Sequence, residues 1–239
     1  MTYRRLILPG VLAFFFSLCL AGTSLAQNIQ LHYDLGSSLY PNELSARPKL
    51  TTTAELFKAD KWGNTFYFVD MDYAEGGIRS AYWELSRELK FWDTPVSIHL
   101  EYDGGLSNRF SYSDAYLLGA TYAYHTSDYS FTLGITPMYK YLRGNGKPHA
   151  FQLTAVWGYT FAKGLLSFNG FMDFWTNRDL KDTAPVVFLT EPQIWLNLNA
   201  IEGISPDFNL SVGSEVEMSY NFVGSKFYAL PTIALKWTF

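Results

Sequence analysis

The sequence predicts an all-β protein: a 12-stranded antiparallel transmembrane β-barrel of the outer-membrane type, preceded by a cleaved signal peptide. Three features carry this prediction: a short apolar leader, alternating apolar and polar residues, and turn-forming residues at regular intervals. The composition agrees, because 18% of the 239 residues are aromatic and only 17% are charged, against about 25% charged residues in an ordinary soluble domain. A mean hydropathy of −0.03 excludes a helical membrane protein.

The N-terminal segment, residues 1–26, has the three-part pattern of a secretory signal peptide. Two arginines precede an apolar stretch over residues 6–20, and the small-residue site Ser24-Leu25-Ala26 follows it. The stretch is shorter than the roughly 20 apolar residues that a membrane-spanning helix needs, and the residues before Cys19 are too large for a lipoprotein signal. We therefore expect export, cleavage before Gln27 and one mature domain, residues 27–239.

The mature chain alternates between apolar and polar residues, which is the pattern of strands with one face in an apolar medium. Residues 96–103 and 209–220 show this pattern, and the C-terminal segment shows it most clearly. Carboxylates are frequent on the polar faces, and burying so many charged groups away from water is costly, so these faces are expected to contact water. The pattern fits an open antiparallel sheet or a membrane barrel. The apolar face of the last segment consists of Phe227, Ala229, Pro231, Ile233, Leu235, Trp237 and Phe239.

Turn-forming residues predict eleven connections and therefore twelve strands. The connections alternate between short and long ones, and an even number of strands returns both termini to one end, as in bacterial outer-membrane barrels. An open sheet of this size would leave unpaired edges, which a bilayer does not tolerate. We expect the long connection 176–185 to fold into the lumen and narrow it. The predicted connections are 37–47, 58–64, 75–79, 90–95, 104–113, 126–128, 143–149, 162–164, 176–185, 200–207 and 221–226.

The main rival is a secreted soluble barrel or sandwich, whose apolar face would point inward. Two features favour the membrane. The C-terminal Phe239, at the end of an alternating strand, resembles the terminal signal that barrel-assembly machinery reads. We therefore expect localisation in the outer membrane, contact with its lipid, and recognition by the assembly machinery through Phe239. Aromatic residues also cluster near predicted strand ends, as in the girdles of membrane barrels: Tyr122, Tyr124, Tyr129, Tyr139, Tyr141, Tyr159 and Phe161.

The sequence gives little support for a catalytic site or a metal site. The four histidines lack metal-ligand spacing with another histidine or with cysteine, and Gly104 and Gly105 are assigned to a turn rather than to a phosphate loop. Ser97 and His99 share a strand face, but a triad needs its base between nucleophile and acid, usually on separate strands; we interpret them as lumen-facing polar residues. A formal charge of −4 excludes a footprint for nucleic acid. We expect no cofactor, no metal site and no enzymatic activity.

The predicted inward faces are acidic and aromatic, and few cations oppose the acids, chiefly Lys140, Lys236 and Arg87. Aromatic side chains ordinarily face lipid in a membrane barrel, so their place beside carboxylates in a wet lumen favours binding of a flat solute that carries hydroxyl groups. The predicted lumen residues are Asp34, Glu55, Phe57, Phe66, Phe68, Asp70, Asp72, Glu84, Glu88, Glu101, Asp103, Phe171, Asp173, Trp175, Glu191, Trp195, Glu215 and Glu217.

Residues 50–90 contain Glu55-Leu56-Phe57, then Trp62, then Phe66-Tyr67-Phe68-Val69-Asp70 and the turn Gly76-Gly77. This order resembles a segment of the nucleoside-specific outer-membrane channel family, the Tsx-like channels. There a Glu-x-Phe strand end leads through a turn with tryptophan into an aromatic strand that ends in aspartate. The resemblance implies a monomeric 12-stranded barrel that binds nucleosides in its lumen. The positions that it implies for binding are Glu55, Phe57, Phe66, Phe68, Asp70, Glu84, Phe171, Asp173 and Trp175.

Residue pattern and resemblance together predict a channel for passive uptake of small planar solutes, nucleosides first, through a narrow lumen with a series of shallow aromatic sites. Two alternatives stay open. A barrel enzyme that modifies outer-membrane lipid needs serine, histidine and acid to meet at the outer rim. A structural barrel with a plugged lumen needs Lys or Arg beside its interior acids.

Overall fold

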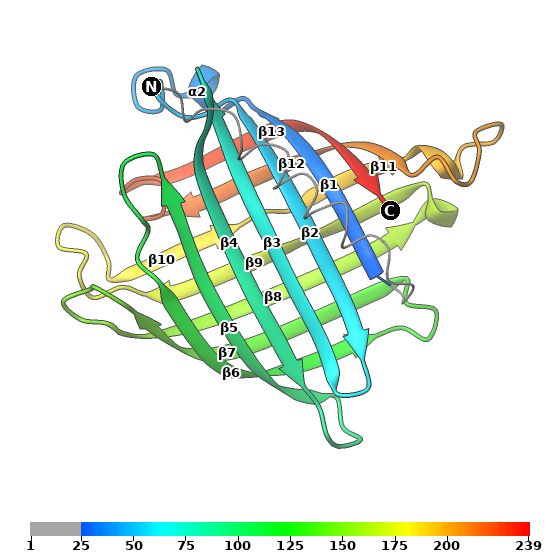
Figure 1. Ribbon diagram of the computed structural model, residues 1–239, viewed down its shortest axis with the longest axis horizontal. Helices are drawn as coiled ribbons and strands as arrows, with labels where there is room; N and C mark the ends of the chain where they lie inside the picture. Colours follow the sequence, from blue (N-terminus) through cyan, green and yellow to red (C-terminus); the bar gives the residue numbers. More distant parts are fainter. Residues whose placement is uncertain (1–24) are drawn as a thin grey trace, which may run out of the picture.

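Alternating apolar and polar residues fold into antiparallel strands that close into a barrel in the computed structural model, which describes residues 25–239 (Figure 1). The last strand pairs with the first, so the sheet has no open edge. The strands of the described part are β1 (Leu25–Asp34), β2 (Leu50–Asp60), β3 (Gly63–Ala74), β4 (Gly77–Leu89), β5 (Val96–Ser107), β6 (Ala115–His125), β7 (Phe131–Leu142), β8 (His149–Phe161), β9 (Leu166–Thr176), β10 (Val186–Thr190), β11 (Gln193–Asn197), β12 (Leu210–Tyr220) and β13 (Phe227–Thr238).

Strands β10 and β11 are two halves of one span. Both pair with β9 on one side and with β12 on the other. Between them lie Glu191 and Pro192, and the ladder is interrupted there because proline has no N–H to donate. The thirteen strands of residues 25–239 therefore make 13 − 1 = 12 spans, which confirms the predicted 12-stranded antiparallel transmembrane barrel.

Helical segments are short and lie in connections: α2 (Gly36–Leu39), η2 (Ala162–Gly164) and η3 (Leu198–Ala200). No helix among the described residues has both the length and the apolar character to cross a membrane. The predicted signal peptide, residues 1–26, lies outside the described residues except for its last two, which begin β1.

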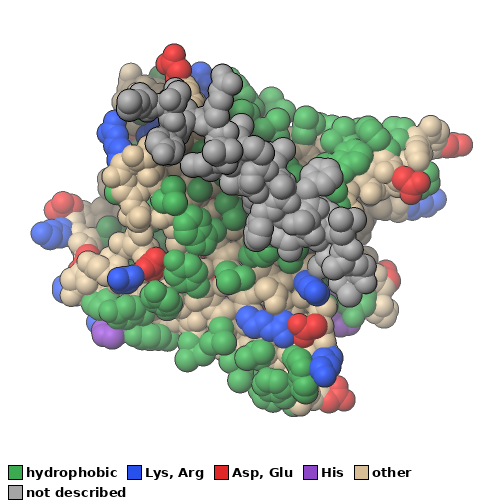
Figure 2. All heavy atoms as spheres, in the orientation of Figure 1, with side chains coloured by type: hydrophobic (Ala, Val, Ile, Leu, Met, Phe, Trp, Pro, Cys, Tyr) green, Lys and Arg blue, Asp and Glu red, His purple; other side chains and the backbone are tan. Residues whose placement is uncertain are grey.

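The barrel is polar inside and apolar outside. On β1 the inward side chains of Gln30, His32 and Asp34 are 1%, 3% and 6% exposed, whereas the outward Ile29 and Leu31 are 46% and 40% exposed. In the view of Figure 2, hydrophobic side chains cover much of the wall, and most charged side chains lie towards its ends. A soluble barrel with its apolar face inward, the rival interpretation of the sequence, is therefore wrong. Only a hydrocarbon medium suits this outer face.

The connections lie at two ends of the barrel. The end with both termini of the barrel, here called the terminal end, carries 61–62, 90–95, 126–130, 162–165 and 198–209. The opposite end, here called the loop end, carries 35–49, 75–76, 108–114, 143–148, 177–185 and 221–226. The positions agree with the predicted turns, but short and long connections do not alternate: 198–209 at the terminal end is long, and 75–76 is a two-residue turn. There Gly76 and Gly77 adopt φ values of 101° and 120°, which favour glycine.

Two further expectations about connections are wrong. Gly104 and Gly105 lie inside β5, and the missing side chain of Gly105 lets the ring of Tyr112 pack against the strand while the Tyr112 N–H donates to the Gly105 carbonyl (2.9 Å). Connection 177–185 extends beyond the strand ends instead of entering the lumen (Figure 1). Its Asp179 accepts a hydrogen bond from the Lys147 N–H of the neighbouring connection (3.2 Å). Connection 35–49 instead contacts the lumen wall, because its Arg47 donates to Asp34 and Glu217.

Candidate functional site: the lumen of the barrel

The register of the sheet places all nine predicted site residues on the lumen face. Directly opposed residues of neighbouring strands share a face, and one such row runs from Asn28 through Glu55, Phe68 and Glu84 to Asp103. Phe57, Phe66 and Asp70 lie at even spacing from this row on β2 and β3, as Phe171, Asp173 and Trp175 do from one another on β9. Phe57 lies apart from the others, near the terminal end, and is 42% exposed.

Neutral donors hold several of the predicted carboxylates. The Asn28 amide donates to Glu55 (2.6 Å), and the Tyr82 hydroxyl donates to Glu84 (2.8 Å). Threonine hydroxyls donate to Asp70 and to Asp173, from Thr53 and Thr154. Hydroxyl and amide donors satisfy a carboxylate without cancelling its charge. The formal charge of these acids is therefore not offset by their hydrogen-bond partners.

The aromatic side chains form a ladder on β3 and β4. The ring centroids of Phe66 and Phe68 lie 6.1 Å apart, and those of Phe68 and Tyr82 also lie 6.1 Å apart. These spacings are within the range of tilted aromatic pairs. Because Glu84 and Asp70 flank the ladder, flat apolar faces and charged acceptors lie side by side, as the sequence predicted.

Lys140 on β7 lies among the acids near the loop end and is buried. Its Nζ donates to Gln152 Oε1 (2.7 Å) and to Asp103 Oδ2 (3.3 Å), and it lies 4.9 Å from the ring centroid of Trp175. The ammonium thus joins β5, β8 and β9 across the lumen surface. Trp175 is thereby held as a cation–π partner rather than as a free stacking face.

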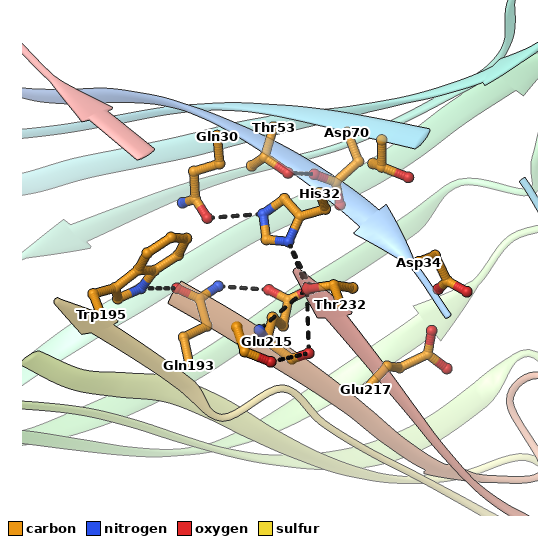
Figure 3. Close-up of polar contacts among 12 residues, drawn as sticks. Gln30, His32, Asp34, Thr53, Asp70, Gln193, Trp195, Glu215, Glu217 and Thr232 are labelled. Atoms are coloured by element: carbon orange, nitrogen blue, oxygen red, sulfur yellow. Dashed lines mark hydrogen bonds and ion pairs between the residues drawn. The ribbon is translucent and has the colours of Figure 1, made fainter. Parts of the chain in front are cut away.

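A second network lies on β1, β11, β12 and β13 (Figure 3). The sequence placed Trp195 and Glu215 in the lumen, but Gln30, His32, Gln193 and Thr232 were not identified. The ring of His32 contacts Gln30 Oε1 (3.0 Å) through Nε2 and Thr232 Oγ1 (3.2 Å) through Nδ1. Gln193 donates to Glu215 (2.6 Å) and accepts from Trp195 Nε1 (3.0 Å). Polar residues at alternate positions 30, 32 and 34 of the first strand are the sequence signal that could have revealed this wall.

Connection 35–49 contacts the lumen wall at the loop end. Arg47 donates through Nε to Asp34 (2.9 Å) and through Nη2 to Glu217 (2.6 Å), and the Gly36 N–H donates to Asp34 (2.6 Å). Arg47 lies within a range that the sequence assigned to a turn only, so its role as a lumen cation was missed. The connection is also held from outside, because Lys226 donates to Glu43 (2.7 Å) and lowers the pKa of that carboxyl.

Ser97 and His99 do not form a catalytic pair. The Ser97 hydroxyl donates to Glu88 (2.5 Å), and the His99 ring lies between Glu88 (2.6 Å, from Nδ1) and Glu101 (3.0 Å, from Nε2). Both ring nitrogens face acceptors, so His99 acts as a donor at both and cannot activate a serine. This agrees with the interpretation of these residues as polar lining.

Large side chains occupy part of the interior. Trp195 is fully buried, and Met138, at 2% exposure, packs with Ala115 and Leu117 into an apolar cluster on the inner face of β6 and β7. Such a filled stretch agrees with the expectation that a barrel of this size has a narrow lumen.

Charges inside the described part of the barrel do not balance. Arg47 pairs with Asp34 and Glu217, Lys140 pairs with Asp103, and His99 pairs with Glu88 and Glu101. Lys236 lies 4.2 Å from the ring centroid of Trp195, whereas the expectation of Arg87 as a lumen cation is wrong, because Arg87 lies on the outer face of β4 and pairs with Asp60. A further group of lumen acids has no ion-pair partner within 4.0 Å in residues 25–239. The formal charge that lacks a counter-charge is therefore negative. This group comprises Glu55, Asp70, Asp72, Glu84, Asp173 and Glu191.

A family model described as "Domain of unknown function (DUF5020)" matches residues 26–239. No curated protein matches the chain. Among solved structures, the chain is similar to one described as "NanC porin structure in rhombohedral crystal form", with a TM-score of 0.56 and 10% identity over 89% of this chain and 99% of that one. LpxR from Salmonella typhimurium gives a TM-score of 0.46 with 12% identity over 90% and 100% of the two chains. Pseudomonas aeruginosa OccK5 (OpdH) gives 0.43 with 10% identity over 90% and 62%. The first of these three is a likeness of the barrel fold.

Proposed function

We propose that this chain, which belongs to the DUF5020 family, is an outer-membrane channel for the passive passage of small solutes through a narrow acidic and aromatic lumen. Its termini would face the periplasm and its loop end the exterior, as in bacterial barrels with an even strand number. It is similar in fold to a structure described as a porin, which supports a channel without identifying the solute.

The observation that carries this proposal is the unmatched negative charge of the lumen. Interior acids such as Asp70, Glu84 and Asp173 are held by hydroxyl donors, and acids of this kind outnumber the buried cations. A lumen that merely needed filling would be more stable with apolar side chains or matched ion pairs. Acids with neutral partners attract cations and accept hydrogen bonds from solutes, and they repel anions.

Nucleosides are the solutes that we propose first. The resemblance to Tsx-like channels covers the segment with Phe66, Phe68 and Asp70, and these side chains line the same stretch of lumen. A base can stack on the aromatic ladder, and its ribose hydroxyls can donate to Glu84 or Glu55. Stacking contributes about 1–3 kcal/mol per base, which is weak enough for passage.

Conductance in planar bilayers tests both levels of the proposal. The purified protein should give discrete channels that favour potassium over chloride, and millimolar adenosine or thymidine should reduce their conductance. Ribose alone is the matched control, because it has the hydroxyls without the base. Cation-selective channels that nucleosides do not block would support the channel proposal and contradict the nucleoside proposal. Channels that favour chloride would contradict the proposed role of the acids.

A structural barrel with a closed lumen is the second candidate, and the buried Trp195 and Met138 and the ion-paired Arg47 favour it. This candidate predicts no conductance from the folded protein at any potential. Folding is checked in the same preparation by heat-modifiable migration in SDS gels. A folded, silent barrel would replace the channel by a structural role.

A further inference from the structure

We infer that the lumen contains a binding site for one divalent cation of the calcium class, formed by Glu84, Glu101 and Asp103. Glu84 on β4 lies directly opposite Asp103 on β5, and Glu101 shares the inward face of β5 two residues away. One carboxylate oxygen from each residue lies within 4.8 Å of the other two. Two oxygens that share a Ca²⁺ ion at about 2.3–2.6 Å are separated by at most about 4.6–5.2 Å, so the three oxygens fit around one ion.

A second observation points to a missing ligand. Oδ1 of Asp103 is buried without a hydrogen-bond partner, on a side chain that is 6% exposed. Its other oxygen, Oδ2, faces Lys140 Nζ at 3.3 Å. A buried carboxylate oxygen without a donor is costly, and among the residues that the structure describes Oδ1 of Asp103 is the only buried carboxylate oxygen without a hydrogen-bond partner. Both oxygens of Asp72, by contrast, accept from hydroxyl groups.

The charges around the cluster leave room for two positive charges. The three carboxylates and the neighbouring Glu88 carry four formal negative charges. Lys140, beside Asp103, and His99, which lies between Glu88 and Glu101 and donates to both, supply two positive charges, which leaves a formal excess of −2. One divalent cation on the free oxygens would neutralise the excess and leave the Lys140 contact in place.

The donor set selects the type of ion. All three ligands are carboxylates on adjacent strands, and hard oxygen ligands suit calcium or magnesium rather than zinc, which favours nitrogen and sulfur. The strands fix the three oxygens on one side of the ion, and water would complete the coordination. Such a one-sided site favours calcium, which accepts flexible geometry, over magnesium, which needs a near-ideal octahedron.

Calorimetric titration of calcium chloride into the chelator-treated, detergent-solubilised protein tests this site directly. We expect one calcium ion per chain, bound at least ten times more tightly than magnesium. Asp103→Asn and Glu84→Gln should each weaken binding at least tenfold. Asp72→Asn is the matched control, because Asp72 is also a lumen acid but has Thr51 and Ser80 on its oxygens, and it should leave binding within twofold.

A further variant and a second readout keep the test decisive. Lys140→Met should strengthen calcium binding, because it removes the competing ammonium. Terbium bound at the site should luminesce when nearby Tyr82 is excited, and calcium should displace the terbium and abolish this signal. Heat-modifiable migration identifies the folded variants that are compared. No calcium binding up to millimolar concentration, or equal weakening by Asp72→Asn, would overturn the site. The titration does not require conductance, so its outcome is separate from that of the channel proposal.

Discussion

Two walls of the lumen hold their acids in different ways. On the first wall, formed by β2, β3 and β4, hydroxyl groups hold Asp70 and Asp72 and no ion pair within 4.0 Å involves these acids in the described residues. On the second wall, formed by β1, β12 and β13, Arg47 binds Asp34 and Glu217 together. Neutral donors leave a carboxylate charged towards the lumen, whereas a guanidinium cancels it.

This difference separates two roles within one surface. The first wall is suited to contact with solutes and cations, because its charge is available and Phe66 and Phe68 lie beside it. The second wall is suited to closing the loop end, because Arg47 ties connection 35–49 to strands at both sides of the barrel closure. Variants on the two walls should therefore change different properties.

Arg47→Ala should have the largest effect on stability. It leaves Asp34, which is buried, and Glu217 without their cation, and removing one partner of a buried pair costs about 3–5 kcal/mol. We expect the loss in free energy of unfolding to lie near the lower bound because Arg47 is partly exposed. Urea unfolding followed by tryptophan fluorescence measures this loss. Arg79→Ala is the control, because Arg79 binds the same connection only through the exposed Ala46 carbonyl, and an equal loss in both variants would contradict the role of the buried pair.

Phe68→Ala should weaken nucleoside block of the channel by about 1–3 kcal/mol, through loss of the stacking face. Phe57→Ala, at the exposed terminal end, should change the block far less. Titration of adenosine against single-channel current gives both values. Equal effects at the two positions would place the solute elsewhere than on the ladder.

Asp70→Asn should lower the preference for potassium over chloride, by roughly twofold for one charge in a narrow lumen. Asp34→Asn should change that preference less, because Arg47, which pairs with both Asp34 and Glu217, already offsets part of the charge at this position. Reversal potentials in a salt gradient measure the preference. A larger shift from Asp34→Asn would reverse the assignment of the two walls.

Acid pH should loosen connection 35–49, and we expect this effect to be smaller than those of the three substitutions above. The hydrogen bond from Lys226 holds the pKa of Glu43 below its ordinary value of 4.5. A lowered pKa means that this contact stabilises the connection above pH 4.5 and is lost as the pH falls through the lowered pKa. We expect more current fluctuations at pH 3 than at pH 7, and the same increase at pH 7 in Glu43→Gln. Glu75→Gln, on the neighbouring turn, should not reproduce it.

Much of the architecture followed from local chemistry in the sequence. Successive side chains of a strand point to opposite faces, so the alternation along residues 27–239 determined which residues face the lumen, including Glu84 and Asp173. Glycine, proline and polar clusters marked the connections because they are the residues that turns require. The break at Glu191 and Pro192 was not among the predicted connections, and it divides one span rather than adding one.

Partners across the lumen were decided only by the closed barrel. Arg47 lies 170 residues from Glu217 in the chain, and its side chain enters the lumen only because β13 closes on β1. Lys140 likewise meets Asp103 and Gln152 through the register of four strands, which no local pattern encodes. Alternation is a property of each strand alone and can be read along the chain. The balance of charge inside a barrel depends on neighbours around its circumference, and only the tertiary structure brings those together.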